Sequence, residues 1–318
     1  MGELLRIEHL KKYFNTSHGT LHAVDDVTFS INEGETLGVV GESGCGKSTL
    51  GRVILHLIDN TDGHIYFQGK NITNVNSKQL SQLRKEMQII FQDPFASLNP
   101  RKTVFQTIRE PLEIAHNLSR EQMDEEVHAV MDTVGLAQRL MNSYPHELDG
   151  GRRQRVGIAR ALIMNPKFVV CDEPVSALDV SIQAQILNLM LDIQEKRGLT
   201  YIFITHDLSV VKYISNNILV MYLGQMVETA PSNELFARPL HPYTKALLSA
   251  VPIPDVHHEK VHVKLQGELT SPIDPADCCR FASRCPYAKD RCFKENPKQE
   301  SINNHMVACH YYREINNL

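Results

Sequence analysis

The sequence predicts an α/β fold built around a mostly parallel sheet. The first observation is an apolar strand over residues 36–40 that leads into a glycine-rich loop and then a helical stretch from residue 47 to about residue 57. The second is a pair of apolar strands, 168–171 and 200–205, each followed by polar side chains. Buried parallel strands have continuous apolar sequences, and ligands bind at their carboxyl ends.

The segments around these strands follow in order. Alternating apolar residues predict strands within residues 4–31, with a tight turn at 32–35. Helical spacing over residues 103–141 predicts a helical insertion between the strands of the α/β core. The other expected elements are a hairpin strand at 64–69, a helix at 78–86, a strand at 87–91, a helix at 180–197, a strand at 218–223, a helix near 233–236 and a helix ending near 250.

The loop after the first apolar strand has the complete G-x-x-x-x-G-K-S pattern of a phosphate-binding loop. Its glycines let backbone N–H groups curl around a β-phosphate, and the following helix points the positive end of its dipole at the anion. We expect Lys47 to reach the β- and γ-phosphate oxygens and Ser48 to hold Mg²⁺. The sequence therefore predicts a nucleoside triphosphate site formed by Gly41, Ser43, Gly44, Cys45, Gly46, Lys47, Ser48 and Thr49.

Two adjacent carboxylates follow the buried strand at 168–171. Asp172 is suited to orient the Mg²⁺ shell, and Glu173 is suited to polarise an attacking water. Because two acids at a buried strand end are costly to desolvate, we expect a catalytic role rather than a solvated turn.

Two further polar side chains follow expected strands. Gln92 comes directly after the strand at 87–91, and His206 comes after the strand at 200–205. Both are expected at the edge of the sheet where ligands bind. A histidine at this edge is either structural or in contact with a γ-phosphate.

Gly150 and Gly151 precede a helical stretch that carries four arginines. A helix that starts in this way offers backbone N–H groups and a positive dipole end to an anion. Considered in isolation, the stretch is better interpreted as a solvated basic helix.

Composition limits the remaining classes. A chain of 318 residues is long enough for about two domains. Its 33 basic residues against 37 acidic ones give no basic excess, which argues against nucleic acid as a partner. No apolar run approaches the ~18 residues that span a bilayer, and the first residues lack the apolar core of a signal peptide. We therefore expect a soluble, cytoplasmic chain.

The phosphate loop, Gln92, the Gly150-Gly151 stretch, the Asp172-Glu173 pair and His206 follow one another along the chain. In this order they resemble the motifs of ABC-type ATPase subunits, over nearly the whole chain. The resemblance implies a P-loop NTPase with a RecA-like core sheet, an antiparallel β subdomain and a helical subdomain that contacts a membrane partner. It implies that Glu173 is the catalytic glutamate, His206 the switch histidine and Gln92 the Q-loop residue. It also implies that ATP is bound with Mg²⁺ held through Ser48, Gln92 and Asp172.

The resemblance adds two further roles. Phe14 best matches the aromatic residue that stacks on adenine in this family, and Tyr13 is the near alternative. ATP on one chain is closed by the signature stretch of a second chain, so hydrolysis couples to the approach of two subunits. The signature residues here are Asp149, Gly150, Gly151 and Arg152.

This signature departs from the family's usual Leu-Ser-Gly-Gly-Gln, because Asp149 replaces the serine and Arg152 replaces the glutamine. A carboxylate about 4 Å from a phosphate charge is repelled by roughly 4 kcal/mol at an effective dielectric constant near 20. Either Arg152 offsets part of this repulsion, or Asp149 turns away and caps the following helix. We expect the ATP site closed by this signature to be weaker than the site holding this chain's own ATP.

A narrower resemblance lies in residues 91–100, 171–185 and 241–244, which are similar to the second ATP-binding subunit of dipeptide and oligopeptide importers. It implies ATP-driven peptide uptake at the cytoplasmic face of the membrane, with two membrane permeases, a partner ATPase and an extracytoplasmic substrate-binding protein. Importers of nickel, glutathione or muropeptides share these motifs, and a soluble non-transport ABC ATPase is the rival class. The expected domains are an ATP-binding core at 1–92 and 166–240, a helical signature subdomain at 93–165 and a C-terminal extension at 241–318.

Five of the seven cysteines lie between residues 278 and 309. The tail has too little apolar content for a core of its own, and a cytosolic location argues against disulfides. Four thiolates on irregular loops suit a [4Fe–4S] cluster, which the importer resemblance also implies in some members. Zinc with help from His305 and His310 is one alternative, unliganded thiols are another, and Cys278 is an alternate ligand. The expected cluster ligands are Cys279, Cys285, Cys292 and Cys309.

Overall fold

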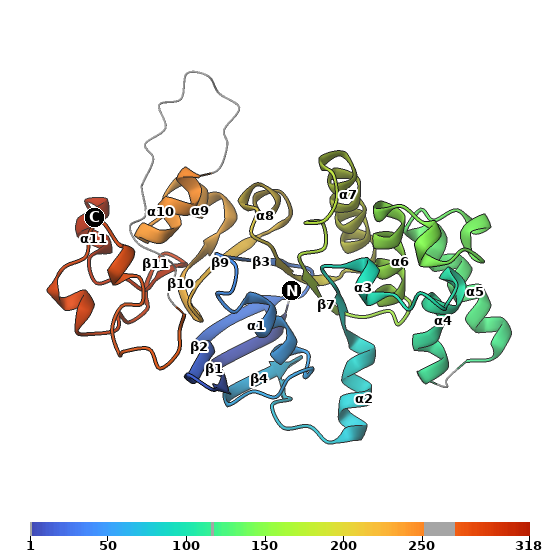
Figure 1. The fold of residues 1–318 in the computed structure, drawn as a ribbon, viewed down its shortest axis with the longest axis horizontal. Helices are drawn as coiled ribbons and strands as arrows, with labels where there is room; N and C mark the ends of the chain where they lie inside the picture. The colour runs from blue at the N-terminus through green and yellow to red at the C-terminus, as the bar shows by residue number, and fades with distance from the viewer. Residues whose placement is uncertain (1, 116–117, 251–270) are drawn as a thin grey trace. The chain divides into compact units, whose positions relative to one another are not determined.

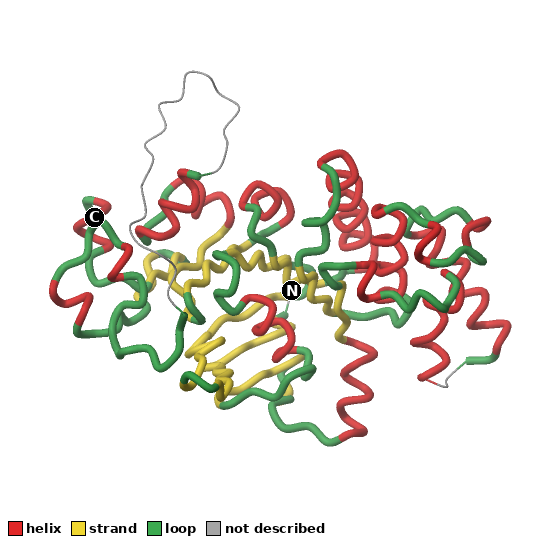
Figure 2. Tube along the Cα trace, in the orientation of Figure 1, coloured by secondary structure: helices red, strands yellow, loops and turns green. Residues whose placement is uncertain are grey.

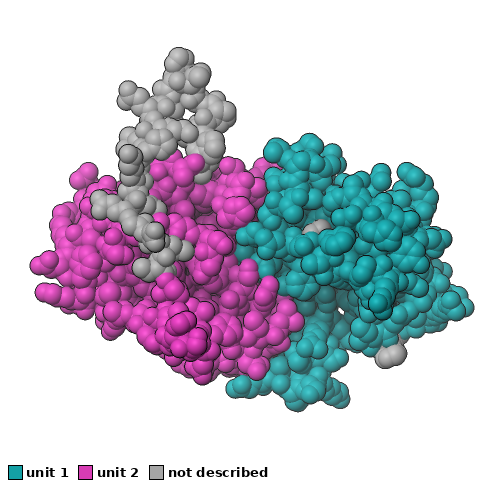
Figure 3. All heavy atoms as spheres, in the orientation of Figure 1, with its two compact units in different colours: residues 1–2, 32–35, 74–204 teal, residues 3–31, 36–73, 205–318 magenta. Residues whose placement is uncertain are grey.

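The computed structural model describes residues 2–115, 118–250 and 271–318, which belong to two compact units (Figure 3). The predicted proline-rich connection that begins at residue 251 lies outside the described residues. Unit 1 comprises residues 1–2, 32–35 and 74–204, and unit 2 comprises residues 3–31, 36–73 and 205–318.

Unit 1 contains a parallel run of three strands. β6 (Met87–Ile90), β7 (Phe168–Asp172) and β8 (Thr200–Ile204) pair in that order, with β7 in the middle. Every residue of β7 and β8 is buried, which confirms the expectation from their continuous apolar sequences. Two helices surround this run in sequence: α2 (Ser77–Glu86) precedes β6, and α7 (Val180–Arg197) connects β7 to β8.

The predicted helical insertion is also confirmed. Figure 1 shows α4, α5 and α6 side by side, and Figure 2 shows this part of unit 1 as helix and loop. The three helices bury Ile108, Met131 and Ile158 on their inner faces, as the helical spacing requires. The insertion comprises α3 (Pro94–Ser97), α4 (Val104–Ala115), α5 (Arg120–Thr133), the 3-10 helices η1 (Gln138–Leu140) and η2 (Pro145–Glu147), and α6 (Gly150–Leu162).

Unit 2 contains two groups of strands. In the first, β3 (Thr36–Val40) pairs in parallel with β9 (Asn217–Tyr222), and β9 pairs antiparallel with β10 (Gln225–Pro231). The second is an antiparallel sheet with the order β2-β1-β4-β5. Its strands are β1 (Glu3–Thr16), β2 (Gly19–Asn32), β4 (Asp62–Phe67) and β5 (Lys70–Asn71).

The helices of unit 2 differ from the prediction in two places, one of which is α8 (Leu208–Ile214), a helix not expected from the sequence. The helix after the phosphate loop ends at Ile54 rather than near residue 57. His56 has a φ of 52°, a left-handed conformation that an α-helix does not continue through. The α-helices of unit 2 that precede the cysteine-rich segment are α1 (Lys47–Ile54), α8 (Leu208–Ile214), α9 (Ser232–Ala237) and α10 (Pro242–Ser249).

The cysteine-rich tail shares the core of unit 2. Its strand β12 (His305–Val307) pairs antiparallel with β10 and also with β11 (Glu300–Ile302). The buried ring of Phe281 packs against Tyr222 and Tyr243, with ring centroids 5.2 and 5.5 Å apart. Within the described residues, the tail therefore packs into the core of unit 2 through Phe281, while its Val307 and Tyr312 form a smaller buried cluster with Leu240. Its remaining elements are η3 (Ala282–Arg284), η4 (Asp290–Phe293) and α11 (Tyr312–Asn316).

Candidate nucleotide-binding and catalytic sites

The phosphate loop connects β3 to α1 in unit 2. Gly46 has a φ of 104°, and a Cβ atom at this position would lie 1.9 Å from the carbonyl oxygen of Ala23, so only glycine fits. The Lys47 Nζ atom donates hydrogen bonds to the carbonyl oxygens of Gly41 and Glu42 at 2.8 and 3.0 Å. The predicted phosphate-binding cation is thus held by the carbonyls of its own loop.

Cys45 lies inside this loop and is buried. Burial raises the pKa of its thiol, which therefore stays protonated near neutral pH. Its backbone carbonyl accepts a hydrogen bond from the Gly224 N–H at 2.9 Å. Cys45 accordingly contributes backbone and packing to the loop rather than a reactive thiolate.

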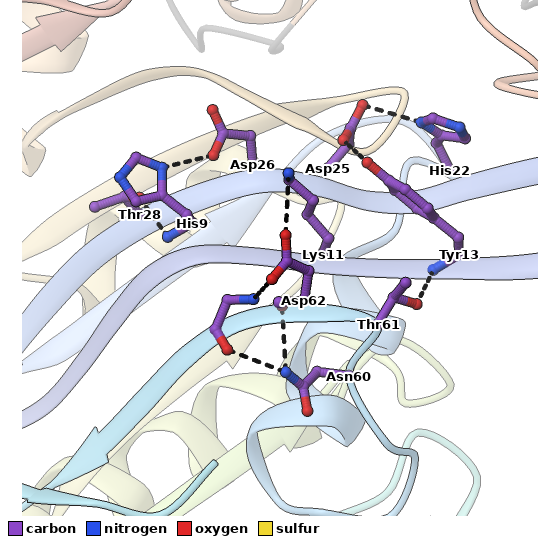
Figure 4. A network of polar contacts seen from close by, with 11 residues as sticks. His9, Lys11, Tyr13, His22, Asp25, Asp26, Thr28, Asn60, Thr61 and Asp62 are labelled. Atoms are coloured by element: carbon purple, nitrogen blue, oxygen red, sulfur yellow. Dashed lines mark hydrogen bonds and ion pairs between the residues drawn. The ribbon is translucent and has the colours of Figure 1, made fainter.

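The two predicted adenine-stacking residues, Tyr13 and Phe14, have different surroundings, and Figure 4 shows those of Tyr13. The Tyr13 hydroxyl donates to the carboxylate of Asp25, and its ring stacks on His22 with centroids 3.9 Å apart. Burial and the bond to Asp25 raise the pKa of Tyr13. The Phe14 ring instead lies 4.9 Å from the ammonium of Lys12. Because Tyr13 is held in this network, the geometry favours Phe14 as the residue that meets adenine.

In unit 1, the structure brings Gln92 and Glu173 together. They follow β6 and β7, which are neighbouring parallel strands, and the Gln92 Nε2 atom donates to Glu173 Oε2 at 2.8 Å. Glu173 has a φ of 48°, a conformation that non-glycine residues adopt rarely and that is often found at functional sites. Asp172, the last residue of β7, is only 3 % exposed. The predicted general base is therefore oriented by the predicted Q-loop amide.

The other predicted catalytic and Mg²⁺-binding residues are divided between the units. Gln92 and Asp172 belong to unit 1, whereas Ser48 and His206 belong to unit 2. His206 is exposed and immediately precedes Asp207, whose carboxylate caps α8 by accepting from the Ser209 N–H at 2.8 Å. Their shared roles around one nucleotide stay predictions.

The signature stretch opens α6. The Asp149 carboxylate accepts a hydrogen bond from the Arg152 N–H at 2.8 Å, and the Nε atom of Arg152 lies 3.4 Å from its other oxygen. Both alternatives weighed for Asp149 are therefore observed together, because it caps α6 and also pairs with the Arg152 side chain. A Cβ atom on Gly151 would lie 2.7 Å from Cγ2 of Ile182 in α7, which explains the glycine. A pocket of about 270 Å³ beside the signature is also lined by Arg155.

The metal prediction for the tail finds no support. Among the residues that the structure describes, no group of three or more His, Cys, Asp or Glu side chains could hold a metal ion. Nε2 of His305 is buried 2.6 Å from a Glu228 carboxylate oxygen, and the ring of His310 contacts the Glu295 carbonyl at 3.0 Å. The two histidines weighed as zinc ligands are therefore engaged elsewhere.

The four predicted cluster cysteines are nevertheless close enough to influence one another. All four are free thiols. Burial raises the pKa of Cys279 to about 12 and that of Cys309 to about 11, and the charges of neighbouring thiols add to both shifts. At neutral pH these two side chains are therefore protonated.

None of the helices in the described ranges is both long and apolar enough to cross a membrane.

The phosphate loop, the glutamine-bound glutamate and the helical insertion that separates them in the sequence define an ATPase of the ABC type. The chain belongs to the ABC transporter family, whose model matches residues 24–176. A second family model, described as the C-terminal region of oligopeptide/dipeptide transporters, matches residues 227–292. The family resemblance noted in the sequence is thereby confirmed.

Individual proteins are similar over nearly the whole chain. The oligopeptide transport ATP-binding protein OppF of Escherichia coli strain K12 is 52% identical over 318 residues, which cover 96% of this chain and 95% of that protein. The oligopeptide transport ATP-binding protein AppF of Bacillus subtilis strain 168 is 49% identical over 322 residues, covering 97% of each chain.

Solved structures share the fold. The cbiO1 protein of Clostridium perfringens, part of the ABC transporter complex cbiONQ, is 30% identical with a TM-score of 0.67 and covers 75% of this chain and 92% of its own. A dimeric ATP-binding cassette in a post-hydrolysis state, bound to ADP and phosphate, is 27% identical with a TM-score of 0.66 and covers 72% of this chain and 99% of its own. The predicted P-loop NTPase fold is confirmed.

Proposed function

We propose that this chain is the ATP-hydrolysing subunit of a transporter that imports oligopeptides or dipeptides. The observation that carries the proposal is similarity beyond the ATPase cassette: residues 227–292 match a C-terminal region described for oligopeptide/dipeptide transporters. Near full-length identity to oligopeptide transport ATP-binding proteins supports the same conclusion. The fold alone serves many transported substrates and would not distinguish among them.

The proposed chemistry is attack of a water molecule on the γ-phosphate of ATP, which breaks the bond to the bridging oxygen and releases ADP and phosphate. Glu173 accepts the proton of that water, and the Gln92 amide keeps its carboxylate oriented. General base catalysis of this kind supplies about 10²–10⁴ in rate. Mg²⁺, which would be held through Ser48, Gln92 and Asp172, neutralises charge on the phosphates. His206 is proposed to contact the γ-phosphate, and Phe14 to stack on adenine.

We further propose that the chain works at the cytoplasmic face of the membrane, with two permeases, a partner ATPase and an extracytoplasmic substrate-binding protein. Support comes from α3, which follows Gln92 and carries Phe95, a large apolar residue that is 55% exposed. The Arg153 guanidinium lies 5.1 Å from the centre of this ring. An exposed aromatic residue three positions after Gln92 suits contact with a membrane subunit that must sense the catalytic site.

The [4Fe–4S] cluster is also retained as a proposal, with zinc as the alternative. The proposal rests on the sequence alone, where Cys279, Cys285, Cys292 and Cys309 lie in a segment expected to form irregular loops; in the structure all four are free thiols. Iron and sulfide analysis after anaerobic purification tests it. Preparations without iron, sulfide or a visible absorption band would exclude the cluster, and stoichiometric zinc would replace it.

Transport in proteoliposomes tests the proposed function directly. The chain is reconstituted with the permeases encoded beside it, their partner ATPase and their binding protein, and uptake of a labelled tripeptide is measured with ATP on the side of the ATPases. We expect uptake that the Glu173→Gln variant does not support. Uptake of nickel, glutathione or a muropeptide without peptide would change the substrate. ATP hydrolysis without association with any permease would favour a soluble ABC ATPase.

A further inference from the structure

The segment from Cys279 to Cys285 carries two arginines, Arg280 and Arg284, whose side chains are largely buried. Both side chains contact residues that precede the C-terminal extension. Arg284 is 8 % exposed, and its two terminal nitrogens donate to the two carboxylate oxygens of Glu42 at 2.8 and 3.2 Å. The bond to Glu42 raises the already high pKa of Arg284. A two-pronged pair of this kind fixes the orientation of both side chains more firmly than a single contact.

Glu42 is the second residue of the phosphate loop, and its backbone is fixed as well. Its N–H donates to the hydroxyl of the buried Tyr243 at 2.9 Å, and its carbonyl accepts from Lys47 at 3.0 Å. Three side chains hold Glu42, namely those of Lys47, Tyr243 and Arg284. The last two belong to the chain beyond residue 240. The conformation of the phosphate loop therefore depends on the C-terminal extension.

The second arginine, Arg280, joins the hydrogen-bonded group formed by Tyr13, Asp25 and His22. Arg280 donates to the carbonyl of Leu223 and to the carboxylate of Asp25, the same carboxylate that receives the Tyr13 hydroxyl. Between the two arginines, the Phe281 ring is fixed in the core of unit 2. One short segment thus contacts the phosphate loop through Arg284 and the Asp25–Tyr13 pair through Arg280.

Charge gives Arg284 a further effect. Glu42 places a carboxylate in a loop whose predicted task is to bind a triphosphate, and like charges repel. The paired guanidinium neutralises that carboxylate. A Glu42 side chain without Arg284 would be an unpaired acid beside the bound phosphates.

We propose that Arg284 is a positioning residue for ATP. It neutralises Glu42 and fixes the phosphate loop, so the cysteine-rich extension sets the affinity of the nucleotide site without touching the nucleotide. The inference depends on ATP binding at this loop and not on the identity of the transported substrate.

Equilibrium binding of Mg-ATP to the full-length Glu173→Gln chain tests the proposal. In this background, we expect Arg284→Met to weaken binding by about tenfold, or ~1.4 kcal/mol. Glu42→Gln should weaken binding less than Arg284→Met does, because the amide removes the repelling charge. The Arg284→Met/Glu42→Gln double variant should recover most of the affinity. Arg291→Gln is the matched control, since Arg291 pairs with Glu295 on the exposed surface of the same extension and should leave affinity unchanged.

A merely structural role would give a different pattern, because removing both partners would disturb the loop at least as much as removing one. Arg284→Met binding within twofold of the parent, or a double variant as weak as Arg284→Met, would overturn the proposal. If Arg284→Met does not fold, Arg284→Lys keeps the charge while losing the two-pronged geometry and should weaken binding by about threefold. Parental affinity in a folded Arg284→Lys chain would then overturn the positioning role. With Glu173 intact, the effect should appear in KM rather than in kcat.

Discussion

The Gln92 amide donates a hydrogen bond to the Glu173 carboxylate at 2.8 Å, although the two residues are 81 positions apart in the sequence. They meet because β6 and β7 are adjacent and parallel, so the residues that follow them leave the sheet at the same edge. The hydrogen bond restricts the carboxylate that is proposed to take a proton from water. Two predictions depend on this contact.

Replacing Glu173 by Gln should nearly abolish ATP hydrolysis while leaving ATP bound. The amide keeps the shape of the side chain but cannot accept a proton, so kcat should fall by about 10²–10⁴. Phosphate release and nucleotide binding are measured on the same preparation. Glu195→Gln, an exposed position on α7, is the control and should retain parental turnover. Wild-type turnover in Glu173→Gln would remove Glu173 from the catalytic role.

Replacing Gln92 by Glu should change the pH dependence of hydrolysis. A second carboxylate beside Glu173 repels its negative charge and so disfavours the ionised form that acts as the base. The acidic limb of the kcat–pH profile should therefore move to higher pH, because Glu173 acts as a base only when ionised. Gln92→Leu removes the donor without adding charge and should lower kcat while causing a smaller movement of that limb. Identical profiles for Gln92→Glu and the parent would contradict the proposed contact.

Replacing Asp149 by Ser should strengthen ATP-driven pairing of this chain. Serine can still cap α6, so the helix is retained, while the negative charge near a partner's γ-phosphate is removed. Light scattering after gel filtration of the Glu173→Gln chain, with and without Mg-ATP, measures the association. Asp149→Asn also keeps a cap and removes the charge, and it should act in the same direction. Unchanged or weaker association in both variants would show that the carboxylate does not limit pairing.

Acidification should destabilise the fold through His241. Burial lowers the pKa of this residue to about 4, below the ~6.5 of an unfolded histidine, although the nearby Glu228 charge opposes the shift. A neutral His241 therefore contributes its full stability above pH 6.5, and this contribution is lost as the pH falls toward 4. The total at stake is at most about 3 kcal/mol.

Urea unfolding between pH 7 and pH 4 measures this effect. Nδ1 of His241 accepts the Tyr243 N–H at 3.1 Å as the cap of α10, a task that asparagine can also perform. We expect His241→Asn to lose less stability than the parent over this range. Equal losses in the two proteins would assign the acid sensitivity to other groups.

Much of the ATPase cassette could be predicted from the sequence because its signals are local. The phosphate loop, its strand and its helix lie within residues 36–54, and α7 has the predicted bounds because Asp179 caps its first turn and Gly198 ends it. Local signals were weaker where two conformations satisfy the same pattern. The role of Asp149 was left open for that reason, and the structure shows it both capping α6 and pairing with Arg152.

The sequence by itself thus determined the fold class, the existence of the strands that precede Gln92 and Glu173, and the expected nucleotide chemistry, because period, apolar runs and glycine positions act over a few residues. Only the tertiary structure decided which distant groups meet. In the folded chain, the Tyr13 hydroxyl donates to Asp25, and Arg284 pairs with Glu42, 242 positions away. Such contacts depend on how strands and loops pack after the chain has closed long loops, and no short sequence pattern encodes that packing.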